Sequence, residues 1–433
     1  MKMKMKMMRS GAIKKNGVLL GLLAAILASA SLVAKADAVL DWNSIAVDTA
    51  VANGQNPFAQ ARSAAIVQLA VFEAVNSITQ KYRPYLGITA PPGASPEAAA
   101  IEAAYRVLKS FFPTSGPTLD TELANALALL PDDQAKADGI TTGDNAARAI
   151  TDLRANDGSS PPQFKIPGPP VQGEWQATPS CPVNENGVQV GIAFQWQNIT
   201  PFGIRSARNF LLTPPPALTS HRYARDYKEL MRVGSIDSTE RPQDRSDVAL
   251  FYAASSPTQV FNQAARQVAQ EQGRSLSENA RALALMNMAI SDSLVASFFN
   301  KYSYNFWRPE TAIHAGNRDG NPRTKADPDF KPFVVTPCFP SYPSNHGSGS
   351  NAAAAVLMRL YGEAGHSITL SNPAVPNIVL QYTSFRQITD DVSDARIYGG
   401  IHFRFDQVAG EHLGRAVGRA VYRHNLRPVH NDD

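Results

Sequence analysis

Three short stretches in the last third of the chain carry the side chains best suited to chemistry. They span residues 301–309, 343–346 and 396–406, and they supply three cations, two histidines, a serine and a carboxylate: Lys301, Arg308, Arg396, His346, His402, Ser344 and Asp406. Lysine and arginine can neutralise a phosphate-like dianion, and arginine can bind two of its oxygens at once. A neutral imidazole can attack or bind the central atom, and a second imidazole can move protons. The set therefore predicts a pocket for one tetrahedral oxyanion.

The first stretch joins two expected helices. Lys301 ends a helical stretch over residues 277–301, and Arg308 follows about two turns later. Pro309 suits the first turn of the next helix. The two cations can thus approach one point from two elements. The alternative is a solvated lysine and an arginine that packs near Trp307.

The second stretch predicts a helix N-terminus. Ser344 and His346 follow a proline and precede a Gly-Ser-Gly-Ser run that opens an alanine-rich helix over residues 350–361. Free N–H groups and the positive end of the helix dipole favour an anion at such a place, and the serine hydroxyl adds a donor. The alternative is an ordinary N-cap with an exposed histidine.

The third stretch places His402 and Asp406 four residues apart, near the start of a helix that runs to about residue 424. Gly399 and Gly400 come just before them and let the backbone approach a ligand closely. Asp406 could orient the imidazole, through a relay or indirectly, and raise its basicity. The alternative is a surface pair with i,i+4 spacing.

Helical periodicity covers most of the chain. Residues 57–79 place apolar side chains at spacings of three and four, as an amphipathic helix does. Similar patterns occur over residues 95–111, 119–130, 134–154, 243–254, 258–272 and 277–301. Clear strands of period two are absent. The expected fold class is therefore mainly α, with a helical bundle as its architecture.

Residues 155–220 differ because prolines interrupt any continuous helix there. Trp175, Trp196 and Phe202 give this segment apolar surface to bury, so we expect an ordered, irregular wrap over the bundle. The alternative is a loose crossover between domains. Beyond the N-terminal segment, one large domain and two fused bundles fit the length equally well.

The N-terminal segment, residues 1–36, is interpreted as a secretory signal peptide. Lysines and an arginine precede an apolar run over residues 18–33, which ends in Ala-Lys-Ala. The mature chain, residues 37–433, is then secreted or periplasmic. A retained anchor is the alternative, but the run is shorter than the ~20 residues of a spanning helix. We expect no stable membrane anchor.

The basicity of the full chain comes from this segment. Residues 1–36 hold seven of the 41 Lys and Arg and none of the 37 Asp and Glu, so the mature chain has a net charge of −3. A nucleic-acid partner is therefore not expected. The two cysteines, Cys181 and Cys338, form either one disulfide or two separate buried thiols.

The three stretches match, in order, the K-x6-R-P, P-S-x-H and R-x5-H-x3-D signatures of the vanadium-dependent haloperoxidases and of the type 2 phosphatidic acid phosphatases that share their site. Residues 196–202 and 214–220 also resemble bacterial secreted haloperoxidase-like proteins, so the resemblance covers most of the mature chain. It implies two packed four-helix bundles with the proline-rich wrap and an active site within residues 301–406.

The resemblance implies a role for each motif residue. His402 bonds the vanadium of vanadate, or becomes phosphorylated in a phosphatase, and His346 is the acid–base residue on the opposite side. The groups that hold the oxyanion would be Lys301, Arg308, Arg396, Ser344 and the amide of Asn345. Lys301 also polarises a bound peroxide, and Asp406 supports His402. Two departures are Asn345, where the family more often has glycine, and Ala395, which replaces a serine before the arginine.

The expected activity is oxidation of bromide or chloride by hydrogen peroxide to hypohalous acid, with vanadate as cofactor. Phe339 falls where chloroperoxidases tend to carry phenylalanine and bromoperoxidases histidine, so it marks the halide pocket. Four further aromatic residues could add apolar wall, but ordinary helix packing is the favoured expectation for them: Phe298, Tyr302, Phe306 and Trp307.

Two other functions stay open at this point. One is a secreted acid phosphatase that uses His402 as nucleophile and needs no metal, although the lack of membrane-spanning helices argues against the lipid-phosphatase branch. The other is a non-catalytic helical protein that binds an oxyanion. The sequence leaves a homo-oligomer open, and it does not identify an organic substrate.

Overall fold

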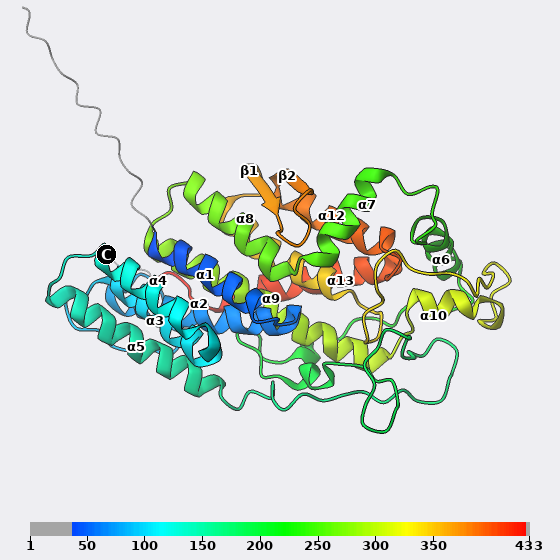
Figure 1. The fold of residues 1–433 in the computed structure, drawn as a ribbon, viewed down its shortest axis with the longest axis horizontal. Helices are drawn as coiled ribbons and strands as arrows, with labels where there is room; N and C mark the ends of the chain where they lie inside the picture. The colour runs from blue at the N-terminus through cyan, green and yellow to red at the C-terminus, as the bar shows by residue number, and fades with distance from the viewer. Residues whose placement is uncertain (1–36, 430–433) are drawn as a thin grey trace, which may run out of the picture. The chain divides into compact units, whose positions relative to one another are not determined.

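The computed structural model describes residues 37–429, so the expected signal peptide lies outside the described residues. The described part contains thirteen α-helices, four short 3₁₀-helices and one two-stranded sheet (Figure 1). The mainly α fold class is confirmed. The α-helices are α1 Ala38–Ala52, α2 Pro57–Thr79, α3 Pro96–Phe111, α4 Gly116–Ala128, α5 Gln134–Arg154, α6 His221–Val233, α7 Gln243–Ala254, α8 Pro257–Glu271, α9 Leu276–Tyr304, α10 Pro309–His314, α11 Asn345–Tyr361, α12 Phe385–Tyr398 and α13 Arg404–His424.

Helices α1, α2, α3 and α5 pack together in the N-terminal half. Two glycines let α5 approach α3 closely. A Cβ added at Gly139 would lie 2.9 Å from the Cβ of Ala98, and one added at Gly143 would lie 2.5 Å from the carbonyl oxygen of Ala99. Side chains at these positions would therefore force the two helices apart.

Helices α9, α11 and α13 form the centre of the C-terminal half, with α8 and α12 packed beside α11. Gly410, Gly414 and Gly418 recur every four residues on the face of α13 that meets α11. A Cβ at Gly410 would lie 2.7 Å from the carbonyl oxygen of Ser344, and one at Gly418 would lie 2.5 Å from that of Ala352. This close approach brings the start of α13 beside the start of α11.

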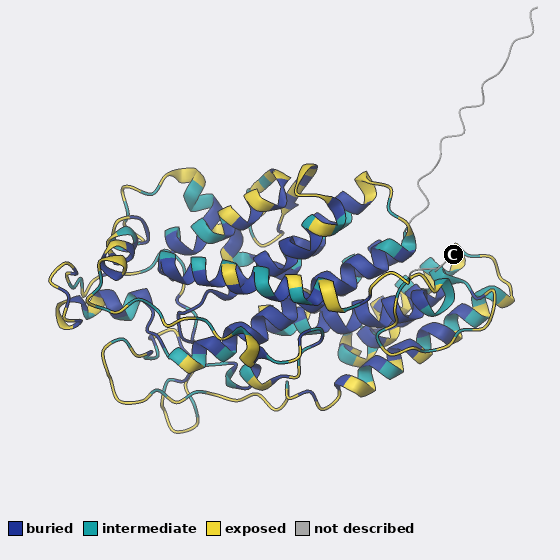
Figure 2. Cartoon of the chain, turned by 180° about the vertical axis from the view of Figure 1, so that it is seen from behind, coloured by how far each residue is buried: buried dark blue, intermediate teal, exposed yellow. Residues whose placement is uncertain are grey.

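Helix α9 joins the two halves because it packs on α2 as well as on α11 and α13. Ser275 and Glu278 form a capping box at its N-terminus, and nearly all of its residues up to Lys301 are buried. Among the described residues it alone is long and apolar enough to cross a membrane, but 94% of its apolar window is buried inside the protein. Figure 2 shows the same concentration of buried residues in the central helices.

The two-stranded antiparallel sheet was not expected from the sequence. It consists of β1 Ala364–Ser371 and β2 Val379–Ser384, with Ile368 opposite Tyr382. His366, Ile368 and Leu370 are buried in alternation and β1 packs on α8. The period-two pattern extends over these few residues only, which is why it does not stand out in a chain dominated by helical periodicity.

The proline-rich segment is an ordered wrap, as expected. Trp175, Trp196 and Phe202 are buried. Asp292 of α9 accepts hydrogen bonds from the backbone N–H groups of residues 202–204, at 2.6–2.9 Å. A buried carboxylate needs such donors, so these bonds fix the wrap to the central helix.

Candidate active site

The first motif brings Lys301 and Arg308 to one point from two elements. Asn305 adopts a left-handed conformation that ends α9, and Arg308 then precedes α10. The wrap holds this turn, because the N–H of Trp175 donates to the carbonyl of Asn305 at 2.7 Å and that of Trp307 donates to Gly173 at 2.9 Å. The two cations lie close enough for the charge of Arg308 to lower the pKa of Lys301.

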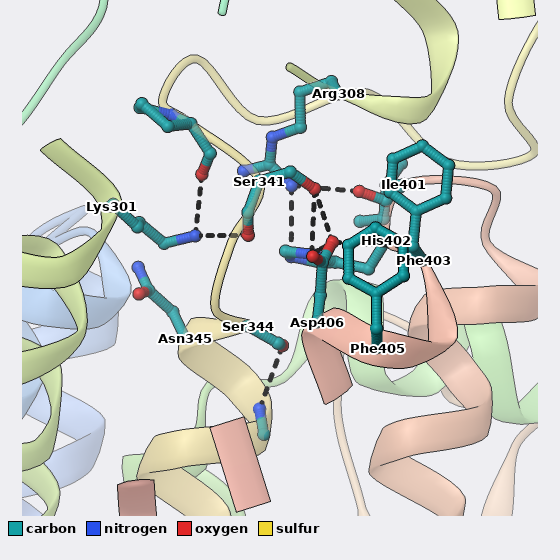
Figure 3. Close-up of polar contacts among 12 residues, drawn as sticks. Lys301, Arg308, Ser341, Ser344, Asn345, Ile401, His402, Phe403, Phe405 and Asp406 are labelled. Atoms are coloured by element: carbon teal, nitrogen blue, oxygen red, sulfur yellow. Dashed lines mark hydrogen bonds and ion pairs between the residues drawn. The ribbon is translucent and has the colours of Figure 1, made fainter. Parts of the chain in front are cut away.

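Both cations are fully buried and held by backbone carbonyls (Figure 3). Lys301 Nζ donates to the carbonyl oxygens of Pro340 at 2.7 Å and Ser341 at 2.8 Å. Arg308 Nε donates to Phe339 at 2.7 Å, and its Nη1 donates to Ile401 at 3.0 Å. The segment 339–341 therefore positions both charges.

The third motif forms a hydrogen-bonded chain. Arg308 Nη1 lies 3.0 Å from His402 Nε2, and His402 Nδ1 lies 2.9 Å from Asp406 Oδ2. A guanidinium can only donate, so Nε2 accepts and the ring proton sits on Nδ1, where it is donated to Asp406. The contact between histidine and carboxylate is direct, whereas the sequence left its nature open.

Asp406 is anchored from two more sides. Its Oδ2 accepts from the hydroxyl of Ser341 at 2.6 Å and from the N–H of Phe403 at 3.1 Å. Burial is the largest influence on this carboxyl and raises its pKa, while the Ser341 bond and the nearby cations lower it. Burial also lowers the pKa of His402 well below the usual range, and Arg308 and Lys301 act in the same direction. His402 is therefore neutral at neutral pH.

The second motif begins α11, as expected, although five residues earlier than residue 350. Ser344 is the N-cap, and its hydroxyl accepts from the N–H of Gly347 at 3.1 Å. The Asn345 side chain accepts from Ser297 at 2.7 Å, so a hydrogen bond to α9 fixes it. The amide of Asn345 is in the first helical turn and has no intrahelical acceptor.

The last two motif residues of the candidate site are His346 and Arg396. His346 is half-buried, and burial followed by the charge of Arg396 lowers its pKa well below the usual range. Arg396 lies on α12, and its Nη1 donates to the carbonyl of Tyr252 at 3.1 Å. Burial lowers the pKa of Arg396 to about 10 and that of Arg308 to about 9. Burial disfavours the charged form of each guanidinium, and a bound anion would act in the opposite direction.

A cavity of 540 Å³ opens on these groups. Asn345, His346, Arg396 and His402 line its polar end. Its remaining wall is almost entirely apolar: Pro57, Phe58, Ile192, Leu250, Ala253, Pro257, Leu294, Phe333, Val334, Val335, Pro337 and Phe339, with Asn56. Lys301, Arg308, Ser344 and Asp406 are not in this wall and lie behind it.

The cavity wall includes Phe339 but none of the four aromatic residues near the first motif. Phe339 lines the cavity, and its ring lies 5.2 Å from Lys301 Nζ. Phe298 packs behind Phe339, with ring centroids 5.3 Å apart, and Tyr302 stacks on Phe298. Phe306 and Trp307 belong to a separate core cluster with Tyr223 and Phe403. Ordinary helix packing, the favoured expectation, is therefore confirmed for all four aromatic residues.

Sequence reasoning missed several contributors. Ser341 bonds the carboxylate that orients His402, but a lone serine in a loop carries no spacing signal. The start of α2 and the junction of α7 and α8 supply cavity wall through Phe58 and Pro257, which are far from the motifs in sequence. Their contribution to the cavity wall can be recognised only once the packing of the helices is known.

The two cysteines form a disulfide, with their Cα atoms 5.3 Å apart. Cys181 belongs to the wrap, and Cys338 directly precedes Phe339. The bridge thus ties the wrap to the segment whose carbonyls hold Lys301 and Arg308.

A family model for the second helical-bundle domain of VCPO matches residues 281–431, which contain all three motifs. The vanadium chloroperoxidase of Curvularia inaequalis is 24% identical over 309 residues, covering 54% of this chain and 50% of that protein. The chain therefore spans about half the length of that curated relative.

Solved structures share the fold. The first bacterial vanadium-dependent iodoperoxidase superimposes with a TM-score of 0.74 at 23% identity, covering 90% of this chain and 97% of that one. An apo-type bacterial vanadium-dependent chloroperoxidase gives a TM-score of 0.68 at 17% identity, covering 85% and 93%. Residues 281–431 are thus similar in sequence to the second helical-bundle domain of VCPO, and the chain shares the fold of bacterial vanadium-dependent haloperoxidases.

The donor set of this site fits vanadate. Among the described residues, Arg308 Nη2 and Arg396 Nε are buried without a hydrogen-bond partner. Buried guanidinium N–H groups normally have acceptors, so an oxyanion would satisfy them. No group of three or more His, Cys, Asp or Glu in residues 37–429 could hold a bare metal ion. The site therefore suits an oxyanion rather than a free metal ion.

Proposed function

We propose that the chain is a vanadate-dependent haloperoxidase that oxidises halide with hydrogen peroxide to hypohalous acid. The position of the cations carries this proposal, since Arg396 lines the polar end of an apolar cavity with His402, and Lys301 and Arg308 act on the same imidazole from outside the cavity wall. The names of the similar proteins, which include chloroperoxidases and an iodoperoxidase, support the same reaction class.

Vanadate would be held by His402 Nε2 and by the donors of Arg308, Arg396 and Lys301. The Nε2 lone pair is available for bonding because the ring proton sits on Nδ1. Arg308 would then donate to an oxyanion oxygen in place of this nitrogen. When bound, vanadate supplies a Lewis-acidic centre that activates hydrogen peroxide for oxidation of halide.

His346 is proposed as the acid–base residue. Its ring lines the cavity, and its lowered pKa keeps it neutral and able to accept a proton from hydrogen peroxide. The imidazolium can then return this proton. Formation of hypohalous acid and water from halide and hydrogen peroxide also consumes one further proton, which solvent supplies. Asp406 and Ser341 keep His402 in a single orientation during these transfers.

Phe339 is proposed as a wall of the halide site. Its ring packs over Lys301 and Arg308, with the Arg308 Cζ 5.0 Å from the ring centroid. An apolar surface beside buried cations weakens halide hydration while retaining electrostatic attraction. Iodide, bromide and chloride should all be tested, because the site geometry does not rank them.

We also propose export to the periplasm or the medium. Residues 1–36 have the pattern of a signal peptide, and the disulfide is a bond that persists in oxidising compartments. A homo-oligomer stays compatible with this proposal.

A phosphatase is the second candidate, because one observation favours it specifically. A neutral His402 oriented by Asp406 is also the arrangement of an activated nucleophile. Such an enzyme would form a phosphohistidine and need no vanadate. The apolar cavity argues against this alternative, since it offers few groups to bind a polar leaving group.

One experiment separates the candidates. Metal-stripped protein is supplied with halide, hydrogen peroxide and phenol red, before and after addition of orthovanadate. We expect halogenation only with vanadate. Failure in all three halides, together with vanadate-inhibited hydrolysis of p-nitrophenyl phosphate by the same preparation, would establish the phosphatase. Absence of both activities with retained oxyanion binding would indicate a non-catalytic protein.

A further inference from the structure

The cavity is larger than the proposed small reactants need. It encloses 540 Å³, whereas a halide ion is a single atom and hydrogen peroxide has two heavy atoms. Protein cavities of about 300–1,000 Å³ typically hold organic molecules of drug size. Most of this volume is therefore left for a third component.

The wall restricts the chemistry of that component. Arg396 is the only permanently charged side chain among the described residues that line the cavity, and it lies at the polar end with the two histidines. The remainder is apolar and includes the rings of Phe58 and Phe339 and three prolines, Pro57, Pro257 and Pro337. An apolar wall with aromatic rings and no charge favours a neutral aromatic molecule.

The cavity is also reachable from solvent. Leu250 and Val335 line it and are 39% and 74% exposed, and Ala253 of α7 is exposed as well. Phe339 and Leu294, in contrast, are buried. A molecule that enters past the exposed residues would reach the end where halide is oxidised.

We propose that this cavity binds a neutral, electron-rich aromatic substrate, so that halogenation takes place inside the protein. The inference rests on the proposed haloperoxidase function. In the overall reaction, halide, hydrogen peroxide, one proton and the aromatic C–H compound give the aryl halide and two waters. The halogen is oxidised by peroxide, the C–H bond breaks, the C–X bond forms, and the ring proton leaves in the second water.

The first test measures the direct binding of 2-naphthol by calorimetry, in the absence of peroxide. The variant Ala253→Trp would fill the outer cavity from an exposed position, and Ala52→Trp is the matched control at an exposed alanine ending α1. We expect binding to wild type and to the control, and a loss of about tenfold or more in Ala253→Trp. Equal affinity in all three proteins, or no binding to wild type, would overturn the inference.

The second test is the ratio of ring positions halogenated on phenol, compared with the ratio given by authentic hypobromous acid in the same buffer. A reaction inside the cavity gives a different ratio, which should move toward that of the free reagent in Ala253→Trp. Identical ratios with vanadate-dependent bromide oxidation intact would overturn the inference and leave the proposed function standing. Naphthol binding without any halide oxidation would retain the aromatic site but overturn the haloperoxidase function and halogenation within it.

Discussion

At the residue scale, the two histidines have different surroundings, so their substitution should have different effects on vanadate binding and turnover. His402 is held between Arg308 and Asp406, while His346 is half-buried at the cavity wall. We expect His402→Ala to abolish vanadate binding and His346→Ala to mostly spare it, with turnover reduced about 10²–10⁴-fold. Calorimetry of vanadate binding and dye bromination measure the two effects. Equal loss of binding in both variants would contradict the assigned roles.

The lowered pKa values of the cations predict proton uptake on anion binding. Burial lowers the pKa of Lys301 well below its usual range and that of Arg308 to about 9. A bound anion raises both values, so protons are taken up and affinity falls as pH rises. Phosphate binding at about pH 8 to 9, measured in two buffers of different ionisation enthalpy, gives the number of protons. An uptake that is unchanged in Lys301→Met would show that Lys301 does not contribute to it.

At the scale of elements, the disulfide should matter to the site as well as to stability. It joins the wrap to Cys338, next to the carbonyls that hold Lys301 and Arg308. We expect Cys181→Ser/Cys338→Ser to lose about 2–5 kcal/mol of unfolding free energy. Vanadate affinity should fall too, because segment 339–341 is freed. A lower Tm with unchanged vanadate affinity would limit the bridge to a stabilising role.

The glycines of α13 offer a matched pair of variants. Alanine usually favours a helix over glycine by about 1 kcal/mol. A Cβ at Gly410 or Gly418 would instead clash with the backbone of α11, so both alanine variants should lower Tm. Gly410 meets Ser344, beside the site, and only its variant should also weaken phosphate binding. Equal weakening by Gly418→Ala would mean that the helix spacing acts on the site as a whole.

At the scale of the whole molecule, the sequence predicted the helices and the grouping of the three motifs better than the cavity. Charge and spacing within short segments identify the motif residues: Lys301, His346, Arg396 and His402. The wall contributed by Phe58 depends on how α2 packs against α9, which no local pattern encodes. The same reason left two alternatives for Trp307, since an aromatic residue beside a motif can pack toward either side.

The sharing of α9 between the two halves predicts how the chain unfolds. This helix packs on α2 in one half and on α11 and α13 in the other, and residues from Asp37 onward form one compact unit. Phosphate at one hundred times its Kd should add about 2.7 kcal/mol to the unfolding free energy. Because Lys301 of the phosphate site lies on α9, which packs on both halves, bound phosphate should stabilise both halves together. We therefore expect one calorimetric unfolding transition, which phosphate shifts as a whole to higher temperature. Two transitions, of which phosphate moves only one, would show that the bundles unfold separately and that α9 does not couple them.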